Sequence, residues 1–160
     1  GPTATEQDTE VITWLEGIAG IKANELAMEI FNSGSILLSM AADEVISSDQ
    51  KFYEENEFRF SVSQIEELGF SNFWDHSEEL SEALESFVKN ENLDFACVLV
   101  TDINHHNSLL LVKGDDEFIN NISYPAVQKS HIYDLKGIVS RKKQLIPFIT
   151  STLKGDSRGI

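Results

Sequence analysis

The sequence predicts a single α/β (α+β) domain in which helices pack on a mixed, partly antiparallel sheet of about five strands. Two apolar runs, FACVLVTDI and SLLLVKG, are separated only by the polar turn NHHN, which is typical of paired strands in the centre of a sheet. Helical periodicity surrounds these runs on both sides. A chain of 160 residues, 41% hydrophobic and 24% charged, has the size and composition of one soluble globular domain.

The first third of the chain is expected to hold short helices followed by a hairpin. Apolar side chains recur at helical spacing over residues 11–18 and again over residues 26–31, and the segment ILLSMAADEVISSD is expected to enter a third short helix. The triplet EEN then predicts a hairpin turn. In the strand that follows, Phe58, Phe60 and Val62 alternate with Arg59, Ser61 and Ser63, so this strand is predicted to be half-buried.

The clearest helix is predicted from a capping box at Asp75 and Glu78 to about Asn92. Its inner stripe is formed by Leu80, Leu84, Phe87 and Val88. After the two central strands, DDEFINNIS predicts a short helix, IYDLKGIVS a last strand and QLIPFITSTLK a closing helix. No internal repeat or low-complexity linker divides this order of elements.

The domain is expected to occupy residues 9–154, between two flexible ends. Residues 1–8 are interpreted as a protease-site remnant, from the opening GP, and a flexible N-terminus, while residues 155–160 form a flexible tail. Such a remnant would make this chain an excised piece of a longer protein, the alternative being a natural product.

The charge balance disfavours several classes of partner. With 27 acidic and 12 basic residues, the net charge of −15 opposes nonspecific binding to nucleic acid. No apolar run approaches the roughly 18 residues of a membrane helix, so no membrane contact is expected. The single Cys97 stands in an apolar strand and is expected to be a small buried side chain, which fits the reducing cytoplasm.

The histidines and carboxylates give no clear catalytic or metal site. His105 and His106 are adjacent, and adjacent side chains diverge, so they are interpreted as part of a solvated turn. His76 and His131 have no partner at a diagnostic spacing. No pair of carboxylates is recognisable as a general acid and base. We therefore expect no catalytic residue and no metal ligand in this chain.

The segment SRKKQ places Arg141, Lys142 and Lys143 where a strand ends and a helix begins. The first turn of a helix has free N–H groups and a positive dipole end, so a phosphate there meets backbone donors as well as cationic side chains. Since successive side chains diverge, two of the three bases are expected to face inward and one outward. Local physics alone leaves two readings open, a phosphate site or a solvated helix start.

The motif GIVSRKKQ followed by Pro147, together with VLVTDINHHNSLLL earlier in the chain, resembles the C-terminal domain of the family II, manganese-dependent inorganic pyrophosphatases. This is the second type of domain associated with the DHH phosphoesterase domain, and it also occurs in related exopolyphosphatases and prune-like proteins. The resemblance extends from about Thr9 to Leu153, which is nearly the whole chain.

The resemblance implies a two-domain hydrolase of phosphoanhydrides. Mn²⁺ (or Mg²⁺) would be bound by the N-terminal DHH domain of the same polypeptide and none by this chain. This chain would clamp pyrophosphate or another phosphoanhydride with Arg141 and Lys142. Ser140 and Gln144 would shape the turn, with Lys143 a weaker contributor. The parent enzyme would be a cytoplasmic homodimer, and the isolated domain a monomer without activity of its own.

Two departures from the family pattern bear on the substrate. The DHH domain is absent from this chain, and Met40 stands, give or take a position, where the family has a second phosphate-binding lysine. The missing lysine leaves alternatives open, namely a non-catalytic polyanion-binding or regulatory module, or a parent enzyme of the exopolyphosphatase type.

Overall fold

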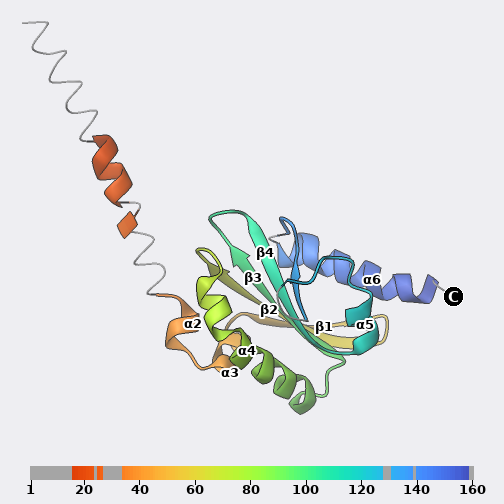
Figure 1. Cartoon of the computed structure of the whole chain (residues 1–160). Coiled ribbons are helices and arrows are strands. Elements are labelled where there is room, and N and C mark those ends of the chain that lie inside the picture. Colours follow the sequence, from red (N-terminus) through yellow and green to blue (C-terminus); the bar gives the residue numbers. More distant parts are fainter. Residues whose placement is uncertain (1–15, 24, 27–33, 128–130, 139, 159–160) are drawn as a thin grey trace, which may run out of the picture. The chain divides into compact units, whose positions relative to one another are not determined.

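The computed structural model describes residues 16–23, 25–26, 34–127, 131–138 and 140–158. The chain divides into two units, Gly1–Gly34 and Ser35–Ile160. In the first unit, residues 16–23 and 25–26 are helical, and the remainder of the two short helices predicted there lies outside the described residues. The second unit contains the sheet and the helices that cover it (Figure 1).

The sheet has five strands in the order β1-β2-β3-β4-β5. Their bounds are Gln50–Glu55 (β1), Phe58–Glu67 (β2), Phe95–Asp102 (β3), Asn107–Gly114 (β4) and Ile132–Asp134 (β5). The β2–β3 pair is parallel, and the other three pairs are antiparallel. A parallel pair needs a crossover connection, which the long helix α4 provides. The predicted fold class, a mixed sheet of about five strands with helices, is confirmed.

Helices lie on both faces of this sheet (Figure 1). Their bounds are Ile36–Ser39 (α2), Ala42–Ser48 (α3), Ser71–Asn90 (α4), Asp116–Asn120 (α5), the π-helical turn Arg141–Leu145 (η1) and Ile146–Arg158 (α6). The buried side chains of α2, α3 and α4 share one core cluster, and those of α5, η1 and α6 share the other. None of the helices described is long and apolar enough to cross a membrane.

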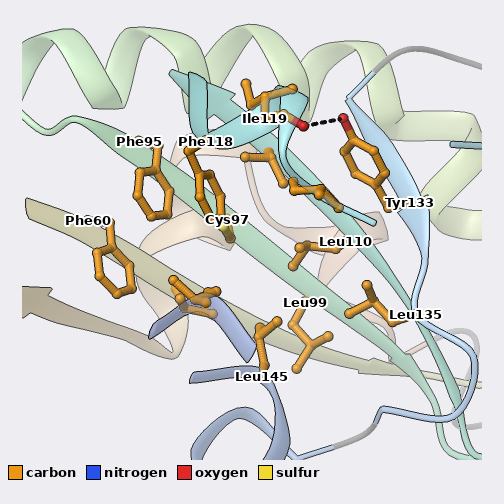
Figure 2. Packing of buried hydrophobic residues seen from close by; sticks show 14 of the residues in the cluster. Phe60, Phe95, Cys97, Leu99, Leu110, Phe118, Ile119, Tyr133, Leu135 and Leu145 are labelled. Carbon is orange, nitrogen blue, oxygen red and sulfur yellow. Dashed lines mark hydrogen bonds between the residues drawn. The ribbon is translucent and has the colours of Figure 1, made fainter. Parts of the chain in front are cut away.

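The core under α5 and α6 is built on stacked aromatic rings (Figure 2). The ring centroids of Phe60 and Phe95 are 4.7 Å apart, and those of Phe95 and Phe118 are 3.9 Å apart. Leu145, Ile149 and Leu153 recur every four residues and bury one face of the last helix against this core. Each such side chain contributes about 1.5–3 kcal/mol when fully buried. This packing fixes the orientation of the SRKKQ turn, which immediately precedes α6.

Cys97 belongs to the same core and is fully buried, as its apolar run predicted. Burial raises the pKa of the Cys97 thiol far above its ordinary value. A thiol that stays protonated is a poor nucleophile, so Cys97 is a packing residue.

The prediction of a half-buried strand over residues 58–63 is wrong. Ser61 and Ser63 are as fully buried as Phe60 and Val62, because β2 is an interior strand with a helical layer on each face. The Ser63 hydroxyl satisfies its hydrogen bond by donating to the carbonyl oxygen of Ile46 in α3. Serine is small enough to be covered completely, so polar alternation did not indicate exposure.

Helix α4 begins at Ser71, earlier than the predicted capping box at Asp75 and Glu78. Its N-cap is Phe70, which makes no side-chain capping bond. Phe73 is fully buried and lies on the same stripe as Ser77, Leu80 and Leu84. Core packing therefore stabilises one more helical turn at the N-terminus, for which the sequence contains no capping motif. The predicted end near Asn92 agrees with the observed end at Asn90 to within two residues.

The last strand is much shorter than IYDLKGIVS predicted. The chain turns after Asp134, whose Oδ1 accepts a hydrogen bond from the backbone N–H of Lys136. Lys136 and Gly137 then adopt φ angles of 53° and 96°, which a strand does not allow. The closing helix correspondingly begins at Arg141 instead of Gln144, and its backbone is helical through Arg158.

Candidate functional site

The SRKKQ segment forms the first turn of the last helix, and Ser140 caps it. Ser140 Oγ accepts a hydrogen bond from the backbone N–H of Lys143 at 3.0 Å, and the N–H of Ser140 donates to Oε1 of Gln144 at 2.9 Å. This reciprocal pair has the form of a capping box, displaced by one residue because the turn is wider than an α-helical one. Ser140 and Gln144 thus hold the shape of the turn.

In the wide turn the three basic side chains point in different directions, one into the protein and two into solvent. The N–H of Leu145 donates to the carbonyl of Ser140 at 3.0 Å, which is the i to i+5 bond of a π-helix. Arg141 and Leu145 are buried, and the residues between them are exposed. The expectation of two inward bases and one outward base is therefore wrong, because only Arg141 faces inward.

The guanidinium of Arg141 is held by the joint between α3 and β1. Its Nη1 donates to the carbonyl oxygens of Asp49 at 2.8 Å and Val62 at 3.1 Å, and its Nη2 donates to Oδ1 of Asp49 at 2.9 Å. The Arg141 side chain is 9% exposed, whereas that of Asp49 is 58% exposed. Of the five N–H bonds of Arg141, the one at Nε and one at Nη2 have no partner among the described residues.

Tyr53 of β1 lies within electrostatic reach of this pair. Burial raises the pKa of the Tyr53 hydroxyl, with the charge of Arg141 acting against that shift and the charge of Asp49 acting with it. The hydroxyl is therefore a neutral hydrogen-bonding group near neutral pH.

Lys142 and Lys143 are exposed and make no ion pair with any described residue. Lys142 lines a shallow hollow of ≈ 790 Å³ along the outer face of α6, opposite the Asn56 turn between β1 and β2. The ammonium of Lys154 and the hydroxyls of Thr150 and Ser151 line the same hollow. The structure therefore places Arg141 and Lys142 on different sides of the turn, each with its own set of neighbours.

No local pattern in the sequence predicts Asp49, Asn56 or Lys154 as neighbours of the turn. Asp49 is separated from Arg141 by 92 positions and ends an unremarkable helix. Only the packing of the last helix across the edge of the sheet brings these residues together. Met40, which the resemblance places where the family has a lysine, lies at the C-cap of α2 with 40% of its surface exposed.

The adjacent histidines lie in the turn after β3, where His105 contacts Asp102. His105 Nδ1 is 2.7 Å from Oδ2 of Asp102, while the ring itself remains largely exposed. Oδ1 of Asp102 accepts hydrogen bonds from the backbone N–H groups of Gly69 at 3.1 Å, Asn104 at 2.9 Å and His105 at 3.3 Å. Asp102 thus organises the turn after β3.

The pKa of Asp102 reflects two opposing effects. Burial disfavours the charged carboxylate, but the hydrogen bonds from Gly69, His105 and Asn104 outweigh it and hold the pKa below its ordinary value. Asp102 is therefore an ionised structural carboxylate near neutral pH.

No metal centre emerges from the described part of the chain. Among those residues, no group of three or more His, Cys, Asp or Glu side chains is placed to hold a metal ion. His76, for example, is turned to the backbone oxygen of Asn72 at 2.8 Å. A pair of manganese ions requires several carboxylate and imidazole donors grouped together, and the described residues do not offer such a group.

Comparison with known proteins identifies what this fold is similar to. The family described as DHHA2 domain matches residues 28–152. A probable manganese-dependent inorganic pyrophosphatase of Clostridium acetobutylicum is 31% identical over 154 residues, which cover 96% of this chain and 50% of that protein. A protein of the same description from Bacillus velezensis is 30% identical over 152 residues, covering 95% of this chain and 49% of that protein.

A solved structure agrees with these sequence matches. The crystal structure of a putative family II inorganic pyrophosphatase of Methanococcus jannaschii superposes with a TM-score of 0.67 at 30% identity. The superposition covers 92% of this chain and 48% of that one. The chain therefore spans about half the length of the relatives that it matches.

Proposed function

Because the chain belongs to the DHHA2 domain family, we propose that it is the phosphate-clamping C-terminal domain of a manganese-dependent inorganic pyrophosphatase-like enzyme. The complete enzyme would hydrolyse diphosphate with water to two phosphates. The observation that carries the proposal is the SRKKQ turn, a capped helix start with one buried arginine and two exposed lysines in a strongly acidic chain.

The proposal divides the work between two halves of one polypeptide. Relatives described as manganese-dependent are about twice as long as this chain, and the described residues offer no metal-binding group. We therefore assign Mn²⁺ (or Mg²⁺) and the activation of water to the N-terminal DHH domain. The role left to this chain is to bind and orient the phosphoryl oxygens.

Arg141 suits that role because its position is fixed before any anion arrives. Two backbone carbonyls hold Nη1, so little conformational freedom is lost when Nε and Nη2 meet a phosphate oxygen. Lys142 contributes differently, because its exposed ammonium is a mobile point charge that can approach a phosphate from the other side of the turn. Ser140 and Gln144 act through the shape of the turn, and Lys143 adds only to the local potential.

Titration of pyrophosphate into the isolated chain tests the proposal. We expect Arg141→Ala and Lys142→Ala each to weaken binding roughly ten- to a hundredfold, because a hydrogen bond to a charged group contributes about 1.5–3 kcal/mol. Lys143→Ala removes the same charge at the neighbouring position and serves as the control. Equal losses in all three variants would mean a diffuse charge patch and would exclude a clamp.

One observation favours a second candidate, a polyanion-binding or regulatory module in a parent that no longer hydrolyses pyrophosphate, or a parent of the exopolyphosphatase type. Met40 offers a phosphate no charge at the place where the resemblance expects a lysine. The sequence preceding this chain in the full protein decides between them. A run containing Asp-His-His with further Asp and His ligands supports the enzyme, and its absence supports the module.

The proposal also covers the assembly and location of the parent protein. We expect a homodimer formed through the DHH domain, a monomeric isolated domain, and a cytoplasmic location. Sedimentation of the isolated chain and of the full-length protein tests the first two expectations.

A further inference from the structure

The pair formed by Arg141 and Asp49 is asymmetric in a way that bears on anion binding. The arginine side chain is nearly buried, and the carboxylate is more than half exposed. Burying a cationic group without a counter-charge is unfavourable, so the isolated domain supplies its own negative charge to Arg141. That charge sits on an element far away in the sequence, at the end of α3.

The carboxylate is not what fixes the position of the guanidinium. Nη1 donates to two backbone oxygens, from Asp49 and Val62, and these stay in place whatever the Asp49 side chain does. The first of them also accepts the N–H of Gln64 at 3.0 Å, which anchors it to β2. The Asp49 carboxylate adds one hydrogen bond, from Nη2 at 2.9 Å, and has no other hydrogen-bond partner among the described residues.

A phosphate that meets Nε and Nη2 would place its oxygen on the same nitrogen that the Asp49 carboxylate binds. Arginine binds both the planar carboxylate and the tetrahedral phosphate along one edge of its fork. Nη2 shares an edge with Nε, where the remaining N–H bonds have no partner among the described residues. Two anionic groups on one nitrogen repel each other strongly in a partly buried site. The exposed Asp49 side chain can rotate into water at little cost, because a half-exposed ion pair is weak.

We propose that Asp49 is a removable counter-ion of Arg141, which neutralises the arginine in the free domain and is displaced by the phosphate oxygen that binds there. The inference rests on the proposed phosphate-clamping function and adds to it a residue that sets affinity. Asp49 lowers the affinity for every anion, because part of the binding free energy is used to displace its carboxylate from Arg141. It is therefore a specificity-determining residue that selects ligands able to outcompete a carboxylate.

The test compares pyrophosphate binding, without metal, by the unmodified chain and by Asp49→Asn. Asparagine has nearly the same shape and can still accept from Nη2 through its carbonyl oxygen, so the variant removes the charge and keeps the geometry. We expect Asp49→Asn to bind pyrophosphate roughly three- to tenfold more tightly. Asp75→Asn on the exposed side of α4 makes the same change of net charge and should alter the affinity by less than about twofold.

Asp49→Asn binding no more tightly than Asp75→Asn overturns the inference, and weaker binding would show that the carboxylate positions Arg141. NMR of the unmodified chain tests the displacement without relying on any variant. As pyrophosphate is added, the NMR resonance of the Asp49 carboxyl carbon should shift toward that of a free carboxylate. The side-chain Nε resonance of Arg141 should shift in the same titration. A shift of the arginine signal alone contradicts displacement.

Arg141→Ala separates failure of the inference from failure of the proposed function. If Arg141→Ala binds pyrophosphate as well as the unmodified chain, the clamp itself is wrong, and the inference is lost with it. If Arg141→Ala loses binding and Asp49→Asn gains none, the clamp stands and only the counter-ion role is wrong. Thermal unfolding of each variant establishes that the chains compared are folded.

Discussion

Ser140 shows how one side chain holds the shape of the candidate site. Its hydroxyl accepts from the N–H of Lys143, and its own N–H is bound by Gln144, so one residue satisfies two positions of the turn. We expect Ser140→Ala to lower the free energy of unfolding by about 1 kcal/mol, because the N–H of Lys143 loses its acceptor. Urea unfolding measures this loss.

The matched control is Ser86→Ala, on the exposed surface of the C-terminal half of α4. Alanine is the better helix former there, so this variant should be as stable as the unmodified chain or slightly more stable. If Ser140→Ala were no less stable than Ser86→Ala, the capping bond would contribute nothing. Pyrophosphate affinity should fall in Ser140→Ala as well if the turn is part of the clamp.

Asp102 gives the fold a predictable dependence on pH. Its folded pKa lies below the ordinary value, so the stability it contributes is present above the unfolded pKa of about 3.9 and is lost as pH falls through the folded pKa. We expect Asp102→Asn to destabilise the chain at pH 7 by about 1–3 kcal/mol, since it loses charge-assisted bonds from backbone N–H groups and from His105. Urea unfolding at pH 7 and pH 3 measures the effect.

The difference between Asp102→Asn and the unmodified chain should shrink at pH 3, because this pH lies below the unfolded pKa of about 3.9, where the stability contributed by the ionised Asp102 is already being lost. A difference that is equal at the two pH values would contradict the assignment. Glu67 acts in the opposite direction, because burial raises its pKa despite the 2.7 Å hydrogen bond from Ser35. The stability associated with Glu67 therefore falls as pH rises from the unfolded pKa toward the folded one, so Glu67→Gln belongs in the same series.

At the scale of elements, the junction between β4 and α5 depends on Gly114. This residue has a φ of 123°, and a Cβ atom placed there would lie 2.6 Å from Cα of Phe95, within the aromatic core strand β3. We expect Gly114→Ala to cost about 3 kcal/mol or more, because both the backbone and the packing of β3 must shift. Chemical denaturation of the purified variant measures the cost.

Gly69 provides the comparison for Gly114. It also has a positive φ, 75°, but a Cβ atom there would meet nothing within 4 Å. Gly69→Ala should therefore cost only the backbone term, about 1 kcal/mol. Similar losses in the two alanine variants would show that the close approach to β3 does not limit the junction.

The edge of the sheet at β1 is the element that connects the two helical layers near the candidate site. α3 packs with α4 on one face, and η1 with α6 belongs to the other. Arg141 reaches from the second layer to the α3–β1 joint at Asp49. A movement of α3 would therefore shift the acceptors of Arg141 at Asp49, and with them the proposed anion site.

For the whole molecule, the proposed division of labour predicts that the chain alone is inactive. With millimolar Mn²⁺ it should release no phosphate from pyrophosphate, because the described residues include no group that could hold two metal ions. A phosphate-release assay on a clean preparation measures this. Release that depends on metal and disappears in Arg141→Ala would contradict the prediction.

The sequence by itself determined those features that arise from neighbouring residues. The central strands β3 and β4 could be predicted because an apolar run of this length is typical of a buried strand. Apolar residues four positions apart are likewise typical of the buried face of a helix such as α6. The role of Ser140 and Gln144 in the turn was expected only from the resemblance, and the structure shows the capping bonds that hold it. The mixed sheet followed from the order of these elements, and the resemblance to the pyrophosphatase domain came from the motifs GIVSRKKQ and VLVTDINHHNSLLL.

Only the tertiary structure decided which residues meet across long separations. Asp49 and Arg141 are 92 positions apart, and no local pattern could pair them. Likewise, the burial of Ser61 and Ser63 and the early start of α4 depend on helices packing over both faces of β2. Packing free energy is shared among residues that are distant in sequence, so it can override local polarity and capping signals. That is why the sequence located the basic turn but not the direction in which Arg141 points or the carboxylate that meets it.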